Sequence, residues 1–206
     1  MTSTPDDDRP SADEALALLV AGNQRFVGGQ TRTAAFRRET LAELARAQRP
    51  YATVVGCSDS RVPPEWVFDA GLGELFVVRV AGNALSPEVA GSLQYAGSHL
   101  RTPLFVVLGH EGCGAIAAAL ATKHEGEQFR SRIQLLVAGI LPGLPDLDPD
   151  LSPEERLSRA VEANVRRTVR QVLETPEGRE RTAEGWMKIV GAVYDVETGR
   201  VRFLPP

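Results

Sequence analysis

Three short apolar runs stand out along the middle of the chain: YATVVGC, ELFVVRVAGN and PLFVVLGH. Each is rich in β-branched and aromatic residues and too continuous to leave one face polar, which is typical of central strands covered on both faces. Helix-like sequences follow the second and third runs, PEVAGSLQYAGSHL and GCGAIAAALATKH. This alternation predicts an α/β fold in which helices flank a mostly parallel central β-sheet.

The two ends of the chain add a helical arm and a hairpin to this sheet. Ser11 with Glu14 three residues later forms a capping box, and it precedes the helical pattern ALALLVAGNQRFV. The apolar stripe of this N-terminal helical arm predicts that one face of the helix is buried. The closing sequence, WMKIVGAVYDVETGRVRFL, predicts a C-terminal strand hairpin around a Thr-Gly turn.

Length and composition favour one ordinary globular domain. The chain has 206 residues, 43% of them apolar and 24% charged, with a net charge of -4. We expect a disordered acidic tail over residues 1–10 and a single α/β domain over residues 11–206. The negative charge argues against a nucleic acid or an anionic membrane as partner. Since the start lacks a secretory signal and no apolar run is long enough to cross a bilayer, we predict a cytoplasmic location.

Metal-ligating residue types follow two of the predicted strands. Cys57-Ser58-Asp59 comes directly after the first apolar run, and His110-Glu111-Gly112-Cys113 closes the third. The carboxyl ends of parallel strands meet at one edge of a sheet, so these two segments can share a crevice. Two thiolates, one imidazole and one carboxylate are suited to tetrahedral zinc. In a reducing compartment, cysteines are more often ligands or catalytic groups than disulfides.

Other cysteine chemistries fit this pattern less well. A thiolate phosphatase loop needs five residues between its cysteine and arginine, whereas Cys57 and Arg61 enclose three. A papain-like pair would leave Cys113 and Asp59 without a role, and the C-x-x-C knuckles of a zinc ribbon are missing from the sequence. A disulfide between the two cysteines stays open as an alternative.

Arg61 follows Asp59 by two residues, a spacing that can form a bidentate ion pair. If Asp59 bound the metal, four protein ligands would close the zinc site to water. If Arg61 held Asp59 away, a water could take the fourth position and be acidified. A plain structural ion pair is an equally good explanation of the two residues.

The sequence resembles the β-class carbonic anhydrases. The resemblance lies in CSDSR at residues 57–61, HEGCG at 110–114, GNQRF near residue 22, GLGELFVVRVAGN, SLQYA and GAVYDVETGRVRF. It extends over nearly the whole chain from about residue 12. It implies reversible hydration of carbon dioxide to bicarbonate and a proton by a zinc-bound hydroxide, with one zinc ion per chain.

Residue roles follow from the resemblance position by position. The permanent zinc ligands would be Cys57, His110 and Cys113, and Asp59 would be either the fourth ligand or the dyad partner of Arg61. The substrate-binding groups would be Gln48 and the backbone amide of Gly114. Two positions depart from the usual pattern: Val80 replaces an asparagine, and Glu111 a small or polar residue.

The resemblance further implies a homodimer or homotetramer acting on carbon dioxide and bicarbonate. It also implies an N-terminal helix that lies across the partner subunit, a role open to the helix over residues 12–27, although its apolar stripe could equally cover its own core. Because two thiolates leave the metal-bound water less acidic, we predict activity that rises toward alkaline pH. Two rival functions use the same ligands. One is hydrolysis of carbon disulfide or carbonyl sulfide; the other is a catalytically silent zinc or bicarbonate-binding protein, which would need neither Asp59 nor Arg61.

Overall fold

A five-stranded sheet organises the computed structural model, which describes residues 9–32, 41–42, 44–148 and 150–205. The order of the strands is β2-β1-β3-β4-β5; the first four are parallel, and β5 runs antiparallel to β4. Their bounds are β1 Ala52–Gly56, β2 Leu75–Arg79, β3 Leu104–His110, β4 Lys188–Tyr194 and β5 Val201–Phe203. The mostly parallel α/β sheet and the C-terminal hairpin expected from the sequence are confirmed.

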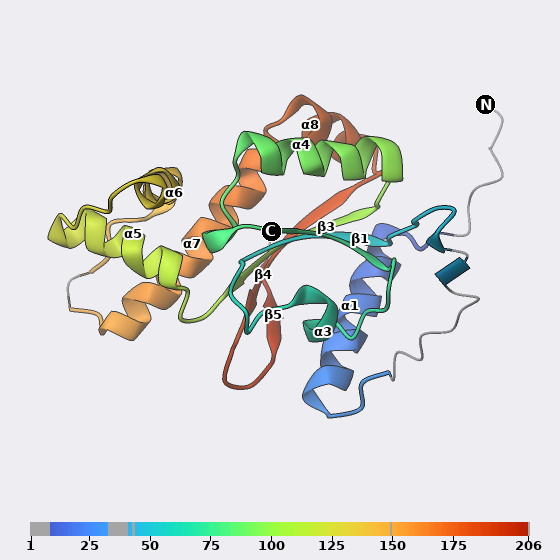
Figure 1. The fold of residues 1–206 in the computed structure, drawn as a ribbon, viewed down its shortest axis with the longest axis horizontal. Helices are drawn as coiled ribbons and strands as arrows, with labels where there is room; N and C mark the ends of the chain where they lie inside the picture. Colours follow the sequence, from blue (N-terminus) through green and yellow to red (C-terminus); the bar gives the residue numbers. More distant parts are fainter. Residues whose placement is uncertain (1–8, 33–40, 43, 149, 206) are drawn as a thin grey trace.

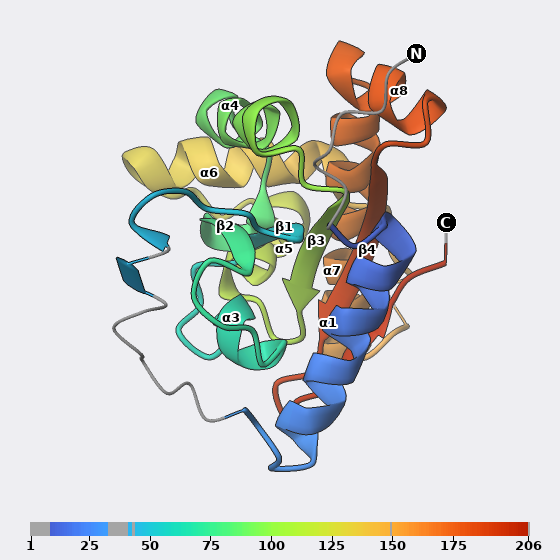
Figure 2. The ribbon, with the colours of Figure 1, turned by 90° about the vertical axis from the view of Figure 1, so that its right-hand side faces the viewer.

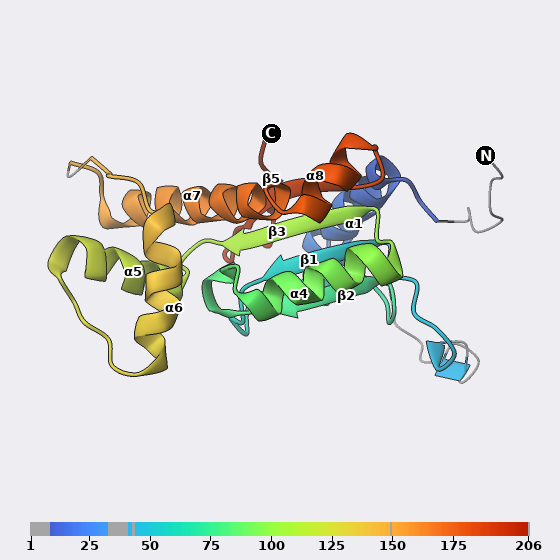
Figure 3. The ribbon, with the colours of Figure 1, turned by 90° about the horizontal axis from the view of Figure 1, so that it is seen from above.

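Helices cover both faces of this sheet. Figure 1 shows α1 and α3 below the sheet and α4 and α8 above it. Helix α7 packs on the same face of the sheet as α4, against β3 and β4. In Figure 3, α5 and α6 extend beyond the carboxyl ends of the strands. The helix bounds are α1 Ala12–Val27, α3 Pro64–Val67, α4 Pro87–Tyr95, α5 Gly114–Glu125, α6 Arg132–Ile140, α7 Pro153–Leu173 and α8 Pro176–Ala183, with the short turns η1 Ala81–Asn83, η2 Ala96–Leu100 and η3 Leu141–Gly143. Over the described part of the chain, none of the helices has the length and apolarity to span a membrane.

The buried strands β1 and β3 divide their side chains between two apolar layers. Val54 and Val106 pack with α1 and α3 on one face, while Val55 and Val107 point to the helices on the other. All of β1 and β3 is buried, because successive side chains alternate between two covered faces. The centre of the sheet is therefore a rigid base for the residues that follow these strands.

The position of β2 differs from the expectation. The sequence predicted three central strands, but β2 lies at the edge of the sheet and its side chains are only half-buried. The apolar pattern of Leu75–Val78 predicts that both faces of this strand are covered, but it carries no information on whether another strand lies beyond it. In the single chain, the apolar strand β2 therefore forms an outer edge of the sheet.

Helix α1 packs on the sheet of its own chain, one of the two roles that the sequence left open. The capping box of Ser11 and Glu14 is present, and Leu19 is fully buried in the layer beneath the sheet. Gly22 lies so close to the carbonyl of Phe68 that a Cβ atom there would be 1.9 Å from its oxygen. This close approach brings α1 against the turn after α3 (Figure 2).

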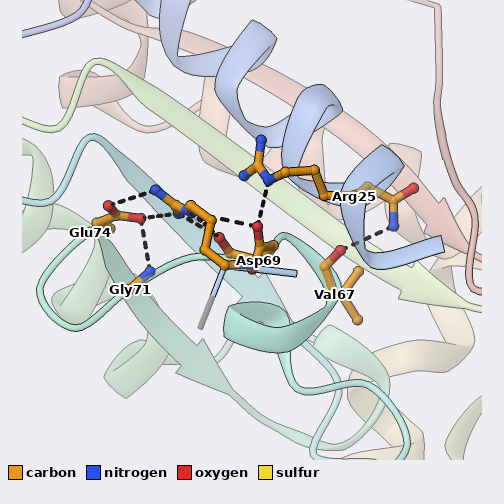
Figure 4. A network of polar contacts seen from close by, with 7 residues as sticks. Arg25, Val67, Asp69, Gly71 and Glu74 are labelled. Atoms are coloured by element: carbon orange, nitrogen blue, oxygen red, sulfur yellow. Dashed lines mark hydrogen bonds and ion pairs between the residues drawn. The ribbon is translucent and has the colours of Figure 1, made fainter. Parts of the chain in front are cut away.

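A buried carboxylate fastens the carboxyl end of α1 to the turn between α3 and β2 (Figure 4). Asp69 accepts hydrogen bonds from Arg25 Nε at 2.5 Å and from the backbone amide of Arg32 at 2.8 Å. Arg32 also donates to Glu74, which in turn accepts from the amide of Gly71. The Asp69 side chain thereby joins two segments distant in sequence, residues 25–32 and the turn before β2.

Candidate metal centre

Three potential metal ligands meet at the carboxyl end of the sheet. Cys57 follows β1, His110 is the last residue of β3, and Cys113 caps the start of α5. Because β1 and β3 are adjacent and in register, their ends lie side by side. One ligand atom from each of the three residues lies within 4.8 Å of the other two, and all three residues are buried.

The two cysteines are free thiols rather than a disulfide. Their sulfur atoms are 4.0 Å apart, about twice the length of a disulfide bond. The hydrogen bond between them lowers the pKa of Cys57 to about 4 and raises the pKa of Cys113. A metal ion bound to both sulfurs would displace the proton of this hydrogen bond.

The ring of His110 is oriented to present one nitrogen to the cysteines. Nδ1 donates to the backbone carbonyl of Glu111 at 2.9 Å, so in the neutral ring the lone pair is on Nε2. Nε2 is buried and has no hydrogen-bond partner within the described residues. A buried nitrogen without a partner is costly, and a metal ion would satisfy it. The two sulfurs and this nitrogen are a donor set that fits zinc.

Asp59 lies beside the cluster and is paired with Arg61. Arg61 Nε and Nη2 donate to the two carboxylate oxygens at 3.0 and 2.8 Å, and the Arg61 amide adds a third bond at 3.0 Å. Asp59 Oδ2 is 3.8 Å from His110 Nε2. The hydrogen bonds from Arg61 hold the pKa of Asp59 well below its usual range, so this carboxylate is ionised.

A family model for carbonic anhydrase matches residues 52–201, from β1 to the start of β5. The chain belongs to the β-class carbonic anhydrases. It is 41% identical over 191 residues to a carbonic anhydrase of Mycolicibacterium smegmatis, a match that covers 91% of this chain and 90% of the relative. It is 39% identical over 190 residues to carbonic anhydrase 2 of Mycobacterium tuberculosis, with 90% and 89% covered.

Solved structures of β-carbonic anhydrases share the fold. One of two tetrameric enzymes from Sordaria macrospora superimposes with a TM-score of 0.76 at 25% identity, covering 94% of this chain and 98% of that one. The Coccomyxa enzyme in complex with acetazolamide gives a TM-score of 0.73 at 28% identity, covering 92% and 86%. The family expected from the sequence is therefore confirmed, and with it the assignment as a carbonic anhydrase.

Two neighbours of the metal centre were missed by the sequence analysis. Arg79, at the end of β2, donates to the carbonyl oxygens of Cys57 and Asp59 at 3.0 and 2.6 Å, so it supports the loop that carries both residues. The amide of Gly82 donates to Cys57 Sγ at 3.3 Å. The Arg79 side chain binds backbone carbonyls and Gly82 uses its own backbone amide, and neither kind of contact leaves a pattern of paired side chains in the sequence. Their place in RVAGN, after a predicted strand, was the available signal.

The two predicted substrate-binding groups lie differently. Gly114 is the exposed first residue of α5, directly after Cys113, so its amide is near the cluster as expected. Gln48 is exposed and precedes β1, whereas Cys57 follows this strand. The five residues of β1 span roughly 16 Å, so the structure does not bring Gln48 to the metal centre of its own chain.

The two departures from the family pattern have local explanations. Glu111 accepts a hydrogen bond from Ser158 Oγ of α7 at 3.1 Å and is not among the clustered ligands. Val80 packs with the apolar side chains between the sheet and α4, and its amide donates to the carbonyl of Gly56. Neither substitution alters the three ligands.

Proposed function

We propose that this β-carbonic anhydrase catalyses the reversible hydration of carbon dioxide at a zinc ion held by Cys57, His110 and Cys113. The supporting observation is the buried, unpartnered His110 Nε2 facing two free thiols. Zinc bound there would supply a positive charge that lowers the pKa of a water at the site.

Asp59 would orient the reacting water. Its Oδ2 is the carboxylate oxygen 3.8 Å from His110 Nε2, where it can accept a hydrogen bond from water beside the metal. Because Arg61 keeps the carboxylate ionised, Asp59 serves as an acceptor and not as a proton donor. Arg61 would thus hold Asp59 off the metal and leave one coordination position for water.

We further propose that the enzyme works as a homo-oligomer. The apolar edge strand β2 is half-buried in the single chain, and such an edge is normally paired or covered. A role for Gln48 in substrate binding requires a second copy of the chain, because Gln48 and Cys57 lie at opposite ends of β1. The molar mass in solution, measured by light scattering, should be at least twice the 22.2 kDa of one chain. A monomer would contradict this proposal.

Stopped-flow hydration assays test the proposed activity. Zinc-loaded protein should hydrate carbon dioxide, faster at alkaline than at neutral pH, while Cys113→Ser should lose both zinc and activity. The matched control is Ser98→Ala, an exposed position remote from the cluster. A chain with one bound zinc and no activity at either pH would contradict the proposal and direct the assays to carbonyl sulfide and carbon disulfide.

A further inference from the structure

Helix α7 carries two buried polar residues on a face that is otherwise apolar. Asn164 is 1% exposed and Thr168 is 0% exposed, whereas their inward neighbours on the helix include Val161 and Val165. Burying polar side chains destabilises the fold unless they form hydrogen bonds. Both donate to one short turn, η1: Asn164 Nδ2 to the carbonyl of Gly82 at 2.8 Å, and Thr168 Oγ1 to that of Asn83 at 3.4 Å.

The backbone of this turn is in an unusual conformation. Gly82 has φ 68° and Asn83 has φ 43°, so two successive residues are left-handed, and the second of them is not a glycine. Such a conformation persists only where the surroundings hold it. Gly82 is packed so closely that a Cβ atom would lie 2.7 Å from Ile140. The hydrogen bonds from α7 help to hold the turn in this conformation, together with the close packing of Gly82.

The same turn donates a hydrogen bond to the metal centre. The amide of Gly82 lies 3.3 Å from Cys57 Sγ and points to it as a donor. Asn164 Nδ2 donates to the carbonyl of the same glycine. One residue of the turn thus connects a buried amide on α7 with a potential zinc ligand on β1.

We propose that Asn164 is a positioning residue for the metal centre. By holding the Gly82 carbonyl it keeps the Gly82 amide directed at Cys57 Sγ, and this hydrogen bond sets how strongly the sulfur donates electrons to the metal. Hydrogen bonds to a ligating sulfur withdraw electron density from it, and groups that orient ligands affect metal affinity. The inference rests on the proposed zinc site.

Cobalt substitution provides a readout that does not depend on activity. Co²⁺ bound by two thiolates absorbs through sulfur-to-metal charge transfer, and a sulfur that loses its hydrogen bond donates more readily. In Asn164→Leu we expect this absorption band to move to longer wavelength. Zinc affinity, measured by competition with a chelator at fixed pH, should fall about tenfold, because Cys57 loses the hydrogen bond that orients its sulfur and this outweighs the stronger electron donation. Thr168→Val should change both quantities in the same direction and less, because its bond is longer.

Val172→Ala is the matched control. Val172 is a buried residue of α7 that packs in an apolar cluster with α4, and within the described residues that cluster includes no residue of η1, so truncating Val172 should lower the melting temperature alone. If Asn164→Leu does not fold, Asn164→Ser replaces it under the same criteria, because its hydroxyl is too short to reach the Gly82 carbonyl.

The outcomes separate the two proposals. If wild-type protein binds cobalt without a thiolate band, the zinc site itself is wrong. If wild-type protein shows the band, and the Asn164 variant matches it in both band position and zinc affinity, Asn164 has no positioning role. A shift that also appears in Val172→Ala would assign the effect to loosened packing and would likewise overturn the inference.

Discussion

Two aspartate–arginine pairs in this enzyme differ in how they are built. Asp59 and Arg61 are two positions apart, and their side chains are 19% and 55% exposed. Asp69 and Arg25 are 44 positions apart, and Asp69 is only 6% exposed. The first pair lies beside the metal centre, and the second joins α1 to the turn before β2 (Figure 4).

The difference shows which pair is free to change. Separating Asp59 from Arg61 requires only a local rearrangement of one loop, because both residues belong to the same turn. Separating Asp69 from Arg25 would leave the buried carboxylate without this charged partner and would release α1 from the turn. An ion pair whose contacts have to change is therefore better built from residues close in sequence. An ion pair that fixes tertiary structure is better built from residues on distant elements.

Replacing Asp59 should have the largest effect, and on activity. In Asp59→Asn we expect the hydration rate per bound zinc to fall about 100-fold or more, because the amide cannot orient water as the carboxylate does. Stability should hardly change, since exposed ion pairs contribute little. Stopped-flow assays at matched zinc content measure the rate; wild-type activity in the variant would remove Asp59 from the mechanism.

Replacing Asp69 should have the converse effect. In Asp69→Asn we expect the free energy of unfolding to fall by about 2 kcal/mol, through loss of charge-assisted hydrogen bonds at a buried site. The hydration rate of the folded, zinc-loaded enzyme should stay the same. Urea denaturation measures the stability. The matched control is Asp13→Asn, which breaks the exposed pair with Lys188 and should leave stability nearly unchanged.

Substituting Arg61 by lysine tests the geometry of the pair near the metal. The charge is kept, but a lysine cannot donate to both carboxylate oxygens at once. We expect activity to fall about tenfold, the worth of one charge-assisted hydrogen bond, with zinc content unchanged. An unaltered rate would mean that charge alone suffices.

The pH dependence of stability is the smallest expected effect. Burial alone would raise the pKa of Asp69, but the hydrogen bonds from Arg25 and the Arg32 amide outweigh it and lower the pKa. Its contribution is therefore complete above about pH 4, the ordinary value of a free aspartate, and is lost as the pH falls through the lower value in the folded chain. Urea denaturation of wild type and Asp69→Asn across acidic pH should show the difference in stability shrinking; a constant difference would contradict the assignment.

The sequence was most informative where structure is local. The apolar runs predicted the strands, and the positions of Cys57, His110 and Cys113 after buried strands predicted that they meet. The edge position of β2 was not predictable, because an apolar pattern does not say which strand is outermost. The hydrogen bond from Asn164 to Gly82 spans 82 positions and ends on a backbone carbonyl, so it could not be predicted from a sequence pattern.

The register between β1 and β3 has a consequence for how the enzyme matures. The ligands come from segments that become neighbours only when Gly56 lines up with Leu108 across two paired strands. A metal ion held by all three ligands would therefore bind late in folding, after the chain has closed the long loop between these strands. Because it would bind the folded chain and not the unfolded one, the supply of metal would set part of the stability of the assembled sheet.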